Sequence, residues 1–597
     1  MRTSPGHPAL GTAATRVERL VGTTTRRWFT AVLVTLALLG WLVARSIQVY
    51  RHLGAARAVL TVTSITLDVN GEERLLRQTR IASSELRKAR DASDDPVFWL
   101  AAHVPLLGRS FSLAREATLV SQQVVDKVLS PVVLTVTSQR GPHLVQHGRV
   151  DLKQLARLEG PLERAALAAA QARRRAEALP TSLVPDVLLS RRQVLVEQVD
   201  RLDRAIATAN TVVSLAPEML GSRGLRRYFL AVQNTAETRG TGGLIGAYAV
   251  VVADHGLITR ERVGTDIDLH AAATPVVDLG RQYADHYDQY RSRQVWSSAV
   301  MTPEWPSAAA TIAGLWTRQS HQAVDGVIGM DPRAMAAVLA VTGPVETAGR
   351  RITSENVVDF ILRDEYMQFA EQPARRKPLL GQLAVGIFDK AVSGGGSSFS
   401  LIKALGSAVH GGHVLLWSHH ETEQVVLQRT VISGRLPDAR ASLEVTSVNA
   451  AGSKLDFYVR RTIGYVRTGT NRATVSVTLV NAVQAQTVPD FVKSRIDRYG
   501  SKHPIAGLDG STSQILTVFG GLGQGLFKAT VNGSPAAFEY GVESGHPYAT
   551  TTVELKPGVP VRVDVTLSDF GGTLVYRQQP LVVDDTLRMS VPFRIQG

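Results

Sequence analysis

The 597-residue sequence predicts a multidomain α+β protein with an N-terminal transmembrane helix, a helical bundle or stalk, a central mixed α/β domain and a C-terminal all-β, sandwich-like domain. Three observations predict this order. One stretch near the N-terminus is apolar and uncharged, the apolar spacing later changes from helical to alternating, and a Gly/Ser-rich break separates the last two patterns. At about 100–200 residues per domain, the length allows roughly three to five structural units.

The composition excludes several classes of protein. Apolar residues make up 44% and charged residues 20%, which excludes a disordered tail or a collagen-like fibre. The chain has no cysteine, so disulfide scaffolds, zinc–thiolate sites, iron–sulfur clusters and cysteine nucleophiles are excluded. A formal net charge of +14 favours acidic partners. Aromatic residues at 6% supply few stacking platforms, so we do not expect nucleic acid among them.

Residues 28–44 are predicted to form the transmembrane helix. This stretch of 17 uncharged residues lies between Arg27 and Arg45, with Trp28 and Trp41 near its two ends. At 1.5 Å rise per residue it just spans about 30 Å of hydrocarbon, and indole rings prefer the two interfaces. A cleaved signal peptide and a buried core helix are the alternatives, but no cleavage site is evident and the stretch is apolar on every side.

The charge on either side of this helix predicts its orientation. Residues 1–27 hold five arginines and one glutamate, whereas residues 45–67 hold three arginines and no acid. Positive residues favour the cytoplasmic side, so residues 1–27 are predicted to be a cytoplasmic tail. We therefore expect a single-pass protein of the cell membrane whose bulk is extracytoplasmic.

Residues 55–225 are predicted to be helical. Apolar residues from Leu195 to Val213 recur at spacings of 4, 3, 4, 3 and 4, with charged residues between them. A second helix is expected from Glu163 to Leu179, with Pro161 in its first turn and Pro180 at its end. The region is either a bundle beside the membrane, which we favour, or a coiled-coil stalk.

Residues 226–400 alternate between strand-like and helical patterns, which predicts an α/β domain. Strands are expected at Tyr228–Val232, Leu244–Ala253 and Val324–Met330, and a helix at Ser307–Gln319. Two further helices are expected with defined caps. Asp331 and Pro332 begin one of them, and Thr353 caps the other with Glu355 in its first turn.

Residues 410–597, beyond the break at Ser393–Ser400, follow a period of two and predict the β-rich domain. Leu455, Phe457 and Val459 alternate with polar residues or tyrosine, and Val475, Val477 and Leu479 alternate with serine and threonine. More strands are expected at Ser513–Phe519, Thr550–Leu555 and Val561–Leu567. Short strands between turns are typical of a sandwich or small barrel.

The segment around Arg239 is the most informative for function. Four glycines lie within seven positions between two predicted strands, beside an arginine and two threonines. Successive N–H groups of such a loop can converge on an oxyanion, and the arginine fork can bind phosphate. The alternative is a tight connection whose glycines only satisfy the geometry of the backbone. The candidate phosphate- or ligand-binding residues are Arg227, Asn234, Arg239, Thr241, Gly242 and Gly243.

Several motifs, in this order, resemble the bacterial family called domain of unknown function 4012. They are Asn234–Gly243, Met301–Ala309, Val324–Pro332, Thr342–Val345, Thr353–Val358, Gly452–Tyr458 and Pro489–Phe491. The resemblance runs from about residue 226 to the C-terminus. It implies a membrane-anchored envelope protein of the kind common in high-GC Gram-positive bacteria, without an established activity.

A more distant similarity is to the LytR–CpsA–Psr envelope phosphotransferases, which move glycopolymers from polyprenyl pyrophosphate onto peptidoglycan. The similarity implies that Arg239 occupies a phosphate-binding position. Thr241-Gly242 stand where that family has Asp-Thr, which puts metal binding and catalysis in doubt. Asp266 and Asp268 are the candidate ligands for Mg²⁺, a cation that prefers oxygen. Their alternative role is a solvated acidic turn.

Two functions remain open from the sequence. The first is a non-catalytic protein of the cell envelope that binds or organises anionic cell-wall polymer and contacts membrane lipid through its anchor. The alternative is a phosphotransferase acting on polyprenyl-linked glycan, for which Mg²⁺ is the one expected cofactor. The sequence does not decide whether the protein is an enzyme.

Overall fold

The computed structural model describes residues 14–62, 71–105, 108–138, 145–347, 349–393, 398–497 and 509–596. The chain forms two compact units, each described here by itself. Unit 1 comprises Met1–Arg140 and Leu158–Asn210, and unit 2 comprises Gly141–Arg157 and Thr211–Gly597. An all-helical unit precedes a mixed unit with β-rich sheets, so the predicted multidomain α+β class is confirmed.

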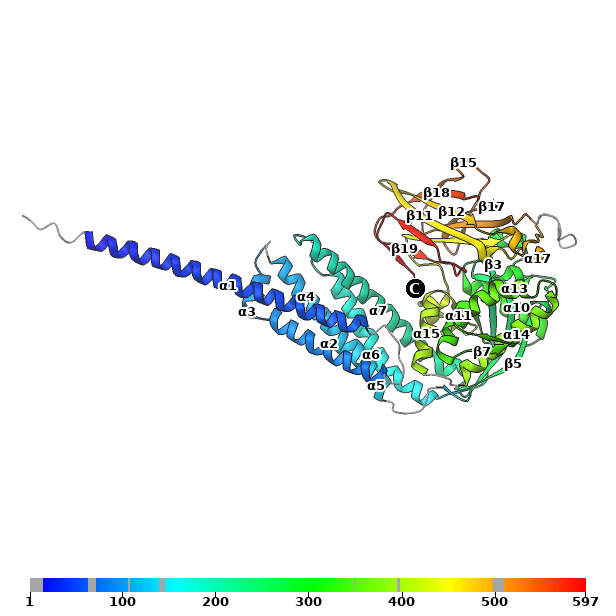
Figure 1. Cartoon of the computed structure of the whole chain (residues 1–597), viewed down its shortest axis with the longest axis horizontal. Coiled ribbons are helices and arrows are strands. Elements are labelled where there is room, and N and C mark those ends of the chain that lie inside the picture. Colours follow the sequence, from blue (N-terminus) through cyan, green and yellow to red (C-terminus); the bar gives the residue numbers. More distant parts are fainter. Residues whose placement is uncertain are drawn as a thin grey trace, which may run out of the picture. The chain divides into compact units, whose positions relative to one another are not determined.

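Unit 1 is a bundle of helices (Figure 1). The elements are α1 (Ala14–Val62), α2 (Gly71–Ser93), α3 (Pro96–Ala102), α4 (Arg109–Gln123), a π-helical turn (Val124–Leu129), α5 (Ser130–Ser138), and the long helices α6 (Leu152–Glu177) and α7 (Asp186–Met219), which continue into unit 2. Small side chains let the helices approach closely, since Ala82 of α2 is buried with Ala56 of α1, and Leu86 of α2 fills the same cluster. On α7, Val199 and Ile206 are buried, as the predicted amphipathic spacing requires.

The start of α6 differs from the prediction. The helix begins at Leu152, where Asp151 Oδ1 accepts hydrogen bonds from the N–H groups of Lys153 and Gln154 at 2.9 and 3.0 Å. Pro161 therefore lies inside the helix and not in its first turn. The earlier cap at Asp151 satisfies the first free N–H groups, which the proline pattern alone did not reveal.

Helix α1 contains the one stretch, among the residues searched, that is long and apolar enough to cross a membrane. It covers Leu33–Arg57 and overlaps the predicted 28–44 over residues 33–44. Its side chains between Leu33 and Trp41 are mostly exposed, whereas Val49 and Ala56 are buried in the bundle. The apolar surface that this unit leaves uncovered is thus concentrated in the first part of the stretch.

The core of the α/β part of unit 2 is a seven-stranded sheet in the order β1-β2-β5-β4-β3-β6-β9. Its pairs are antiparallel except β3 with β6, which is parallel. The strands are β1 (Val145–Gln146), β2 (Arg149–Val150), β3 (Arg226–Arg239), β4 (Gly242–Asp254), β5 (Leu257–Thr265), β6 (Gly326–Met330) and β9 (Val414–Ser418). A separate hairpin pairs β7 (Val345–Thr347) with β8 (Arg350–Ile352).

Helices cover this sheet with two apolar clusters (Figure 1). One cluster joins Phe229 of β3 to Trp305 and Trp316. The other joins Val232 and Ala236 of β3 to Met335 and Leu383. The helices of the chain between β5 and the sandwich are α8 (Gly280–Tyr287), α9 (Trp296–Ala299), α10 (Trp305–Ser320), α11 (Pro332–Thr342), α12 (Val357–Asp359), α13 (Glu365–Gln368), α14 (Pro373–Val392), α15 (Ser398–His410) and α16 (Glu421–Leu427), with a π-helical turn at Phe360–Asp364.

Two local predictions in this part have different outcomes. Asp331 caps α11 as predicted, accepting hydrogen bonds from Arg333 N and Ala334 N. The helix predicted to start at Thr353 starts at Val357, with Asn356 at its N-cap. Thr353 instead makes a local turn, in which its N–H donates to Asn356 Oδ1 at 2.8 Å.

The C-terminal part of unit 2 consists of two six-stranded sheets, in the orders β16-β17-β13-β10-β19-β21 and β15-β14-β18-β12-β11-β20. Their shared core includes Val475, Val477, Leu479, Val563 and Leu567, all buried as the alternating pattern predicts. The strands are β10 (Ser442–Asn449), β11 (Val459–Gly469), β12 (Arg472–Asn481), β13 (Thr512–Gly520), β14 (Leu526–Val531), β15 (Ser534–Pro535), β16 (Glu539–Glu543), β17 (His546–Leu555), β18 (Val561–Ser568), β19 (Leu574–Arg577), β20 (Thr586–Met589) and β21 (Phe593–Ile595), with the short helix α17 (Asp490–Lys493).

One predicted strand of this sandwich is wrong at its start. Residues Asp456–Tyr458 form a 3₁₀ turn, and the strand begins only at Val459. Asp456 is buried and accepts hydrogen bonds from Thr238 N at 2.7 Å, Asn449 Nδ2 at 2.9 Å and Gln514 Nε2 at 2.7 Å. These tertiary bonds hold the carboxylate inward and override the alternating pattern.

Candidate functional site

The glycine-rich segment is the turn of a β-hairpin, which agrees with the tight connection that the sequence left open beside an oxyanion-binding loop. β3 runs to Arg239 and β4 begins at Gly242, so only two residues connect the strands. A Cβ on Gly240 would lie 2.1 Å from Met301 O, and one on Gly243 would lie 2.2 Å from Asn234 O. Side chains are sterically excluded at both positions, so these glycines have a structural reason to be there.

Arg239 directs its guanidinium into the protein main chain. Nε donates to Ser297 O at 2.9 Å, and Nη1 donates to Thr238 O at 2.8 Å and Asn449 O at 3.3 Å. Burial lowers the pKa of Arg239, although Glu237 and Asp456 raise it. The side chain thus joins the hairpin to the sandwich, with several of its donors already used.

The other candidates in the hairpin are dispersed. Arg227 lies near the start of β3 and pairs through Nε with Glu261 Oε2 at 2.9 Å. Thr241 is buried and its Oγ1 accepts a hydrogen bond from Gln233 Nε2 at 2.7 Å, next to Gly242 at φ +131°. Asn234 is buried, and its Nδ2 donates to Tyr366 Oη at 2.7 Å. Arg227 and Arg239 do not line a shared cavity with the other candidates in the described part of the chain.

A small cavity lies beside this hairpin, with a volume of about 40 Å³. That volume holds a few water molecules, whereas sites for drug-sized ligands have about 300–1,000 Å³. The wall is mainly apolar with five ionisable or amide side chains. Its lining residues are Val232, Gln233, Asn234, Glu237, Leu244, Gly246, Ala247, Asp266, Met335, Ile361, Arg376, Leu380, Leu383 and Ala384.

The charged groups at this cavity are paired. Arg376 Nη1 donates to Glu365 Oε1 at 2.8 Å, and the guanidinium lies 4.5 Å from the ring centre of Tyr366. Lys454 Nζ lies 3.4 Å from Glu237 Oε1. Burial raises the pKa of the Glu365 carboxyl, against the opposing effect of Arg376. Glu365, Arg376 and Lys454 were not found from the sequence, because no motif links positions so far apart.

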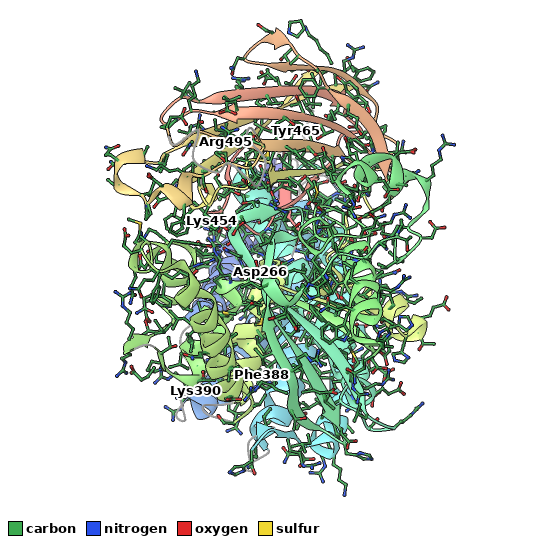
Figure 2. All side chains as sticks on the ribbon, turned by 90° about the vertical axis from the view of Figure 1, so that its right-hand side faces the viewer. Asp266, Phe388, Lys390, Lys454, Tyr465 and Arg495 are labelled. Carbon is green, nitrogen blue, oxygen red and sulfur yellow. The ribbon has the colours of Figure 1, made fainter. Side chains whose placement is uncertain are left out.

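The two candidate metal ligands have different surroundings. Asp266, near the middle of the view in Figure 2, lines the cavity. Asp268 is exposed and its Oδ2 accepts a hydrogen bond from Thr265 N at 2.8 Å, which closes a short 3₁₀ turn. Within the ranges that the structure describes, no three His, Asp or Glu side chains are grouped as ligands of one ion. A Mg²⁺ ion at Asp266 would need most of its oxygen ligands from water or a phosphate.

A second concave surface, larger and open, lies at one end of the sandwich and has a volume of about 870 Å³. It is formed by the β11–β12 turn, the start of β14 and the segment after β18. The rings of Phe527 and Phe570 are both exposed there. Its lining residues are Arg467, Gly469, Thr470, Asn471, Arg472, Phe527, Ser568, Asp569, Phe570 and Gly571. We call this surface the Arg–Phe concavity.

An arginine guanidinium group stacks on each of the two aromatic rings of the Arg–Phe concavity. The guanidinium carbon of Arg472 lies 4.5 Å from the ring centre of Phe527, and that of Arg440 lies 4.2 Å from the ring centre of Phe570. Arg467 pairs with Asp569. Burial would raise the pKa of Asp569, but hydrogen bonds from Arg467 and Gly571 N lower it overall.

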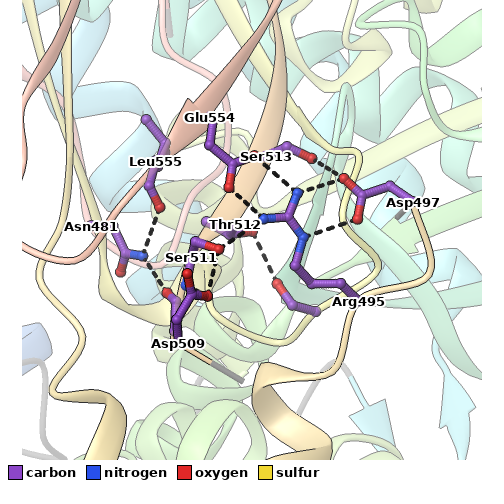
Figure 3. Close-up of polar contacts among 11 residues, drawn as sticks. Asn481, Arg495, Asp497, Asp509, Ser511, Thr512, Ser513, Glu554 and Leu555 are labelled. Carbon is purple, nitrogen blue, oxygen red and sulfur yellow. Dashed lines mark hydrogen bonds and ion pairs between the residues drawn. The ribbon is translucent and has the colours of Figure 1, made fainter. Parts of the chain in front are cut away.

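Arg440 and Arg472 are exposed, and neither forms an ion pair with a carboxylate in the described ranges of the chain. Arg495 in the same sandwich shows the contrast (Figure 3). It is buried, and its guanidinium contacts Asp497 Oδ2 at 2.6 Å and Glu554 Oε1 at 2.5 Å. Arg495 is therefore neutralised within the fold, whereas Arg440 and Arg472 keep their charge available to solvent.

A comparison with known protein families gives a match over the segment that contains the β3–β4 hairpin. Residues 223–366 match the family described as "Protein of unknown function (DUF4012)". Over this segment the chain is similar to the DUF4012 family. The match contains the hairpin, the Asp266/Asp268 pair, Glu365 and Tyr366, and it ends before Arg376. A search of curated proteins found no match.

The DUF4012 match covers less of the chain than the resemblance predicted. It ends at residue 366, whereas the motifs quoted from the sandwich, such as Gly452–Tyr458, lie beyond it. The Arg–Phe concavity also lies outside the match. Sequence reasoning missed it because exposed arginine and phenylalanine residues at separate turns form no linear pattern.

Proposed function

We propose that this chain is a single-pass, membrane-anchored protein of the Gram-positive cell envelope whose extracytoplasmic sandwich binds an anionic cell-wall polymer. The Arg–Phe concavity carries this proposal. It combines an open volume in the range of ligand sites with the exposed guanidinium groups of Arg472 in its wall and of Arg440 stacked on Phe570, neither of which is ion-paired among the described residues. The DUF4012 domain then positions the sandwich and holds it by buried bonds.

The chemistry of the Arg–Phe concavity fits an acidic saccharide. Guanidinium groups bind carboxylate and phosphate oxygens through two parallel hydrogen bonds, and they remain charged at any physiological pH. The exposed faces of Phe527 and Phe570 offer apolar area against which a sugar ring or glycerol unit can pack. The net charge of +14 adds a long-range attraction for a polyanion.

The apolar part of α1 supports the membrane location. Most of its apolar side chains between Leu33 and Val43 are exposed in the described part of unit 1, and a bilayer would cover them. The arginine bias of residues 1–27 favours a cytoplasmic N-terminus, so the sandwich is extracytoplasmic in this proposal.

Polymer binding can be tested with the full-length protein in detergent micelles. Poly(glycerol phosphate) is the anionic probe, and neutral dextran of similar length is the control polymer. We expect the variant carrying both Arg440→Ala and Arg472→Ala to bind the anionic probe about tenfold more weakly, since each lost charge-assisted bond contributes about 1 kcal/mol or more. Arg562→Ala is the matched control, because Arg562 is exposed in the same sandwich but pairs with Asp564.

The binding measurement with poly(glycerol phosphate) can either support or contradict the proposal. A tenfold loss confined to the double variant, with Arg562→Ala equal to wild type and no binding of dextran, supports the proposal. Equal affinities of wild type and the double variant for poly(glycerol phosphate) would contradict it.

A LytR–CpsA–Psr-like phosphotransferase, which moves a glycopolymer from polyprenyl pyrophosphate to the cell wall, is the second candidate. The cavity beside the DUF4012 hairpin favours it, because Asn234, Asp266 and Arg376 meet an apolar wall there. Mg²⁺ held at Asp266 would supply charge neutralisation for the pyrophosphate. The volume of about 40 Å³ requires the cavity to open before a lipid tail enters.

The transferase proposal is tested by incubating the full-length protein with a polyprenyl-pyrophosphate-linked glycan and Mg²⁺, and measuring released polyprenyl phosphate. Release by wild type that is lost in Asp266→Asn, and kept in Asp268→Asn, supports a site at the cavity. Absence of release and of lipid binding in wild type would exclude it.

A further inference from the structure

One end of the unit 1 bundle exposes a group of large apolar side chains. Trp99 and Leu100 of α3 are exposed, as is Val104 directly after it. Leu183 and Val187, at the turn from α6 to α7, are exposed by 62% and 68%. We call these five residues the apolar cap. Side chains of this size are unfavourable in water when they gather in one place.

Contacts between α3 and α1 place the first half of the apolar cap beside residues 41–45, at the end of the predicted transmembrane helix (residues 28–44). Trp41 Nε1 donates to Asp95 Oδ1 at 3.1 Å, and Arg45 Nε donates to Asp95 Oδ2 at 3.2 Å. Asp95 is the N-cap of α3, so α3 begins at the level of residues 41–45. Figure 1 shows α3 beside α1 where α1 joins the other helices.

The second half lies at a similar level along α1. Arg191 Nη2 donates to Tyr50 Oη at 2.7 Å. At a rise of 1.5 Å per residue, Tyr50 lies about 13 Å along α1 from Trp41. Val187 lies one helical turn before Arg191 in α7. Val184 packs with Leu113 of α4. The neighbouring residues of α4, Phe111 and Ala114, pack in the cluster that includes Leu42 and Phe98.

We propose that the apolar cap inserts into the outer headgroup region of the bilayer that α1 spans, giving the bundle a second, interfacial contact with lipid. This rests on the membrane anchoring proposed above. Indole rings favour the boundary between hydrocarbon and headgroups, and shallow insertion of Leu and Val buries apolar area there. The bilayer is the occupant that the geometry favours, because α1 itself carries the surface to this depth.

The charges around the apolar cap fit a headgroup environment. Asp95 pairs with Arg45, and Asp94 pairs with Arg90 and Arg115. Arg109, at the start of α4, is exposed at the same end and suits an anionic headgroup. Asp186 is exposed beside Val187 and must remain in the hydrated part of the interface. Insertion at two separate points would restrict how far the bundle can tilt about α1.

The absence of cysteine makes a direct test feasible, since one introduced cysteine gives a unique label. Leu100→Cys and Leu183→Cys probe the apolar cap. Val34→Cys lies in the apolar stretch, and Leu134→Cys on α5 is a matched control with a similarly exposed leucine outside the cap. Each full-length variant carries an environment-sensitive fluorophore and is reconstituted into phosphatidylglycerol/phosphatidylcholine vesicles, with or without a lipid that bears a headgroup-proximal spin label.

We expect quenching of about twofold or more at Leu100 and Leu183, with little change at Leu134. Quenching at Val34 by a lipid spin-labelled deeper in the acyl chain, together with co-flotation of the protein with vesicles, establishes the anchor independently. If the protein floats and Val34 is quenched while Leu100 and Leu183 match Leu134, the apolar cap faces water or another protein and the inference is overturned. If Val34 is not quenched and the protein does not float, the anchor itself fails, and the inference fails with it.

Discussion

The cavity beside the DUF4012 hairpin and the Arg–Phe concavity differ in how they use charge. At the cavity, Arg376 pairs with Glu365, Lys454 pairs with Glu237, and the nearby Arg239 is bonded to main-chain carbonyls. At the Arg–Phe concavity, Arg440 and Arg472 stack on exposed rings and leave their charge to solvent. The cavity lies beside the glycine-rich motif but has little free volume. The Arg–Phe concavity has an open surface but no sequence motif.

This difference teaches that a dense glycine motif can reflect backbone packing as readily as ligand binding. Gly240 and Gly243 approach other main-chain atoms too closely for any side chain. An arginine beside such glycines is buried by the same packing. Ligand binding depends on what remains accessible, and Arg440 and Arg472 of the sandwich keep exposed guanidinium groups.

The largest expected effect comes from Gly243→Ala. The new methyl group would lie 2.2 Å from Asn234 O, so the hairpin must distort, and we expect the free energy of unfolding to fall by about 3 kcal/mol. Urea unfolding followed by tryptophan fluorescence measures this. Gly246→Ala in the same hairpin is the control, because its Cβ would meet nothing closer than 3.7 Å. Equal loss in both variants would show that the close approach at Gly243 is not limiting.

Arg239→Ala is expected to lower the free energy of unfolding by about 2 kcal/mol. Three carbonyl groups, of Thr238, Ser297 and Asn449, would lose a charged donor in a partly buried setting. Arg227→Ala is the matched control from the same strand, since its pair with Glu261 is partly exposed to solvent. The comparison fails if Arg239→Ala leaves the unfolding midpoint unchanged and instead abolishes binding of a phosphate-bearing ligand.

Glu304→Gln tests a buried carboxyl near this hairpin. Burial raises the pKa of Glu304 to about 7, even though Leu436 N donates to its Oε1 at 2.6 Å. Between about pH 4.5 and 7 the folded state keeps a proton that the unfolded state has lost, so the free energy of unfolding falls as pH rises. Gln stays neutral and should remove a loss on the order of 1–2 kcal/mol at pH 8, with little effect at pH 4. Denaturant midpoints at both pH values measure this, and parallel pH profiles of the two proteins would contradict it.

The smallest effect on stability is expected for Arg440→Ala with Arg472→Ala. Both side chains are exposed, so the free energy of unfolding should change by about 0.5 kcal/mol or less. The same variant should show a weaker salt dependence in its binding to poly(glycerol phosphate), because fewer charges contact the polymer. A titration at two salt concentrations measures this. Loss of stability comparable to that of Arg239→Ala would remove the distinction between the two regions.

Much of the fold follows from local patterns, whereas the sites depend on contacts between distant segments. The amphipathic spacing around Val199 and the alternation of Val475 with Val477 each report a single element, and both positions are buried as predicted. Asp456 shows the limit, since its turn is set by Thr238, which lies 218 residues away. The pairing of Arg376 with Glu365 and the stacking of Arg440 on Phe570 likewise depend on tertiary structure. The roles predicted for Arg227, Asn234, Thr241 and Asp268 remain predictions.

The buried carboxylate of Asp456 has a mechanical consequence. Its two oxygens accept bonds from both the DUF4012 hairpin and the sandwich, so separating these parts would expose an ionisable group and three donors together. These bonds resist separation of the two parts together, because all of them must be lost at once. In the proposed polymer-binding role, a pull on the sandwich would be transmitted through Asp456 to the segment that matches DUF4012.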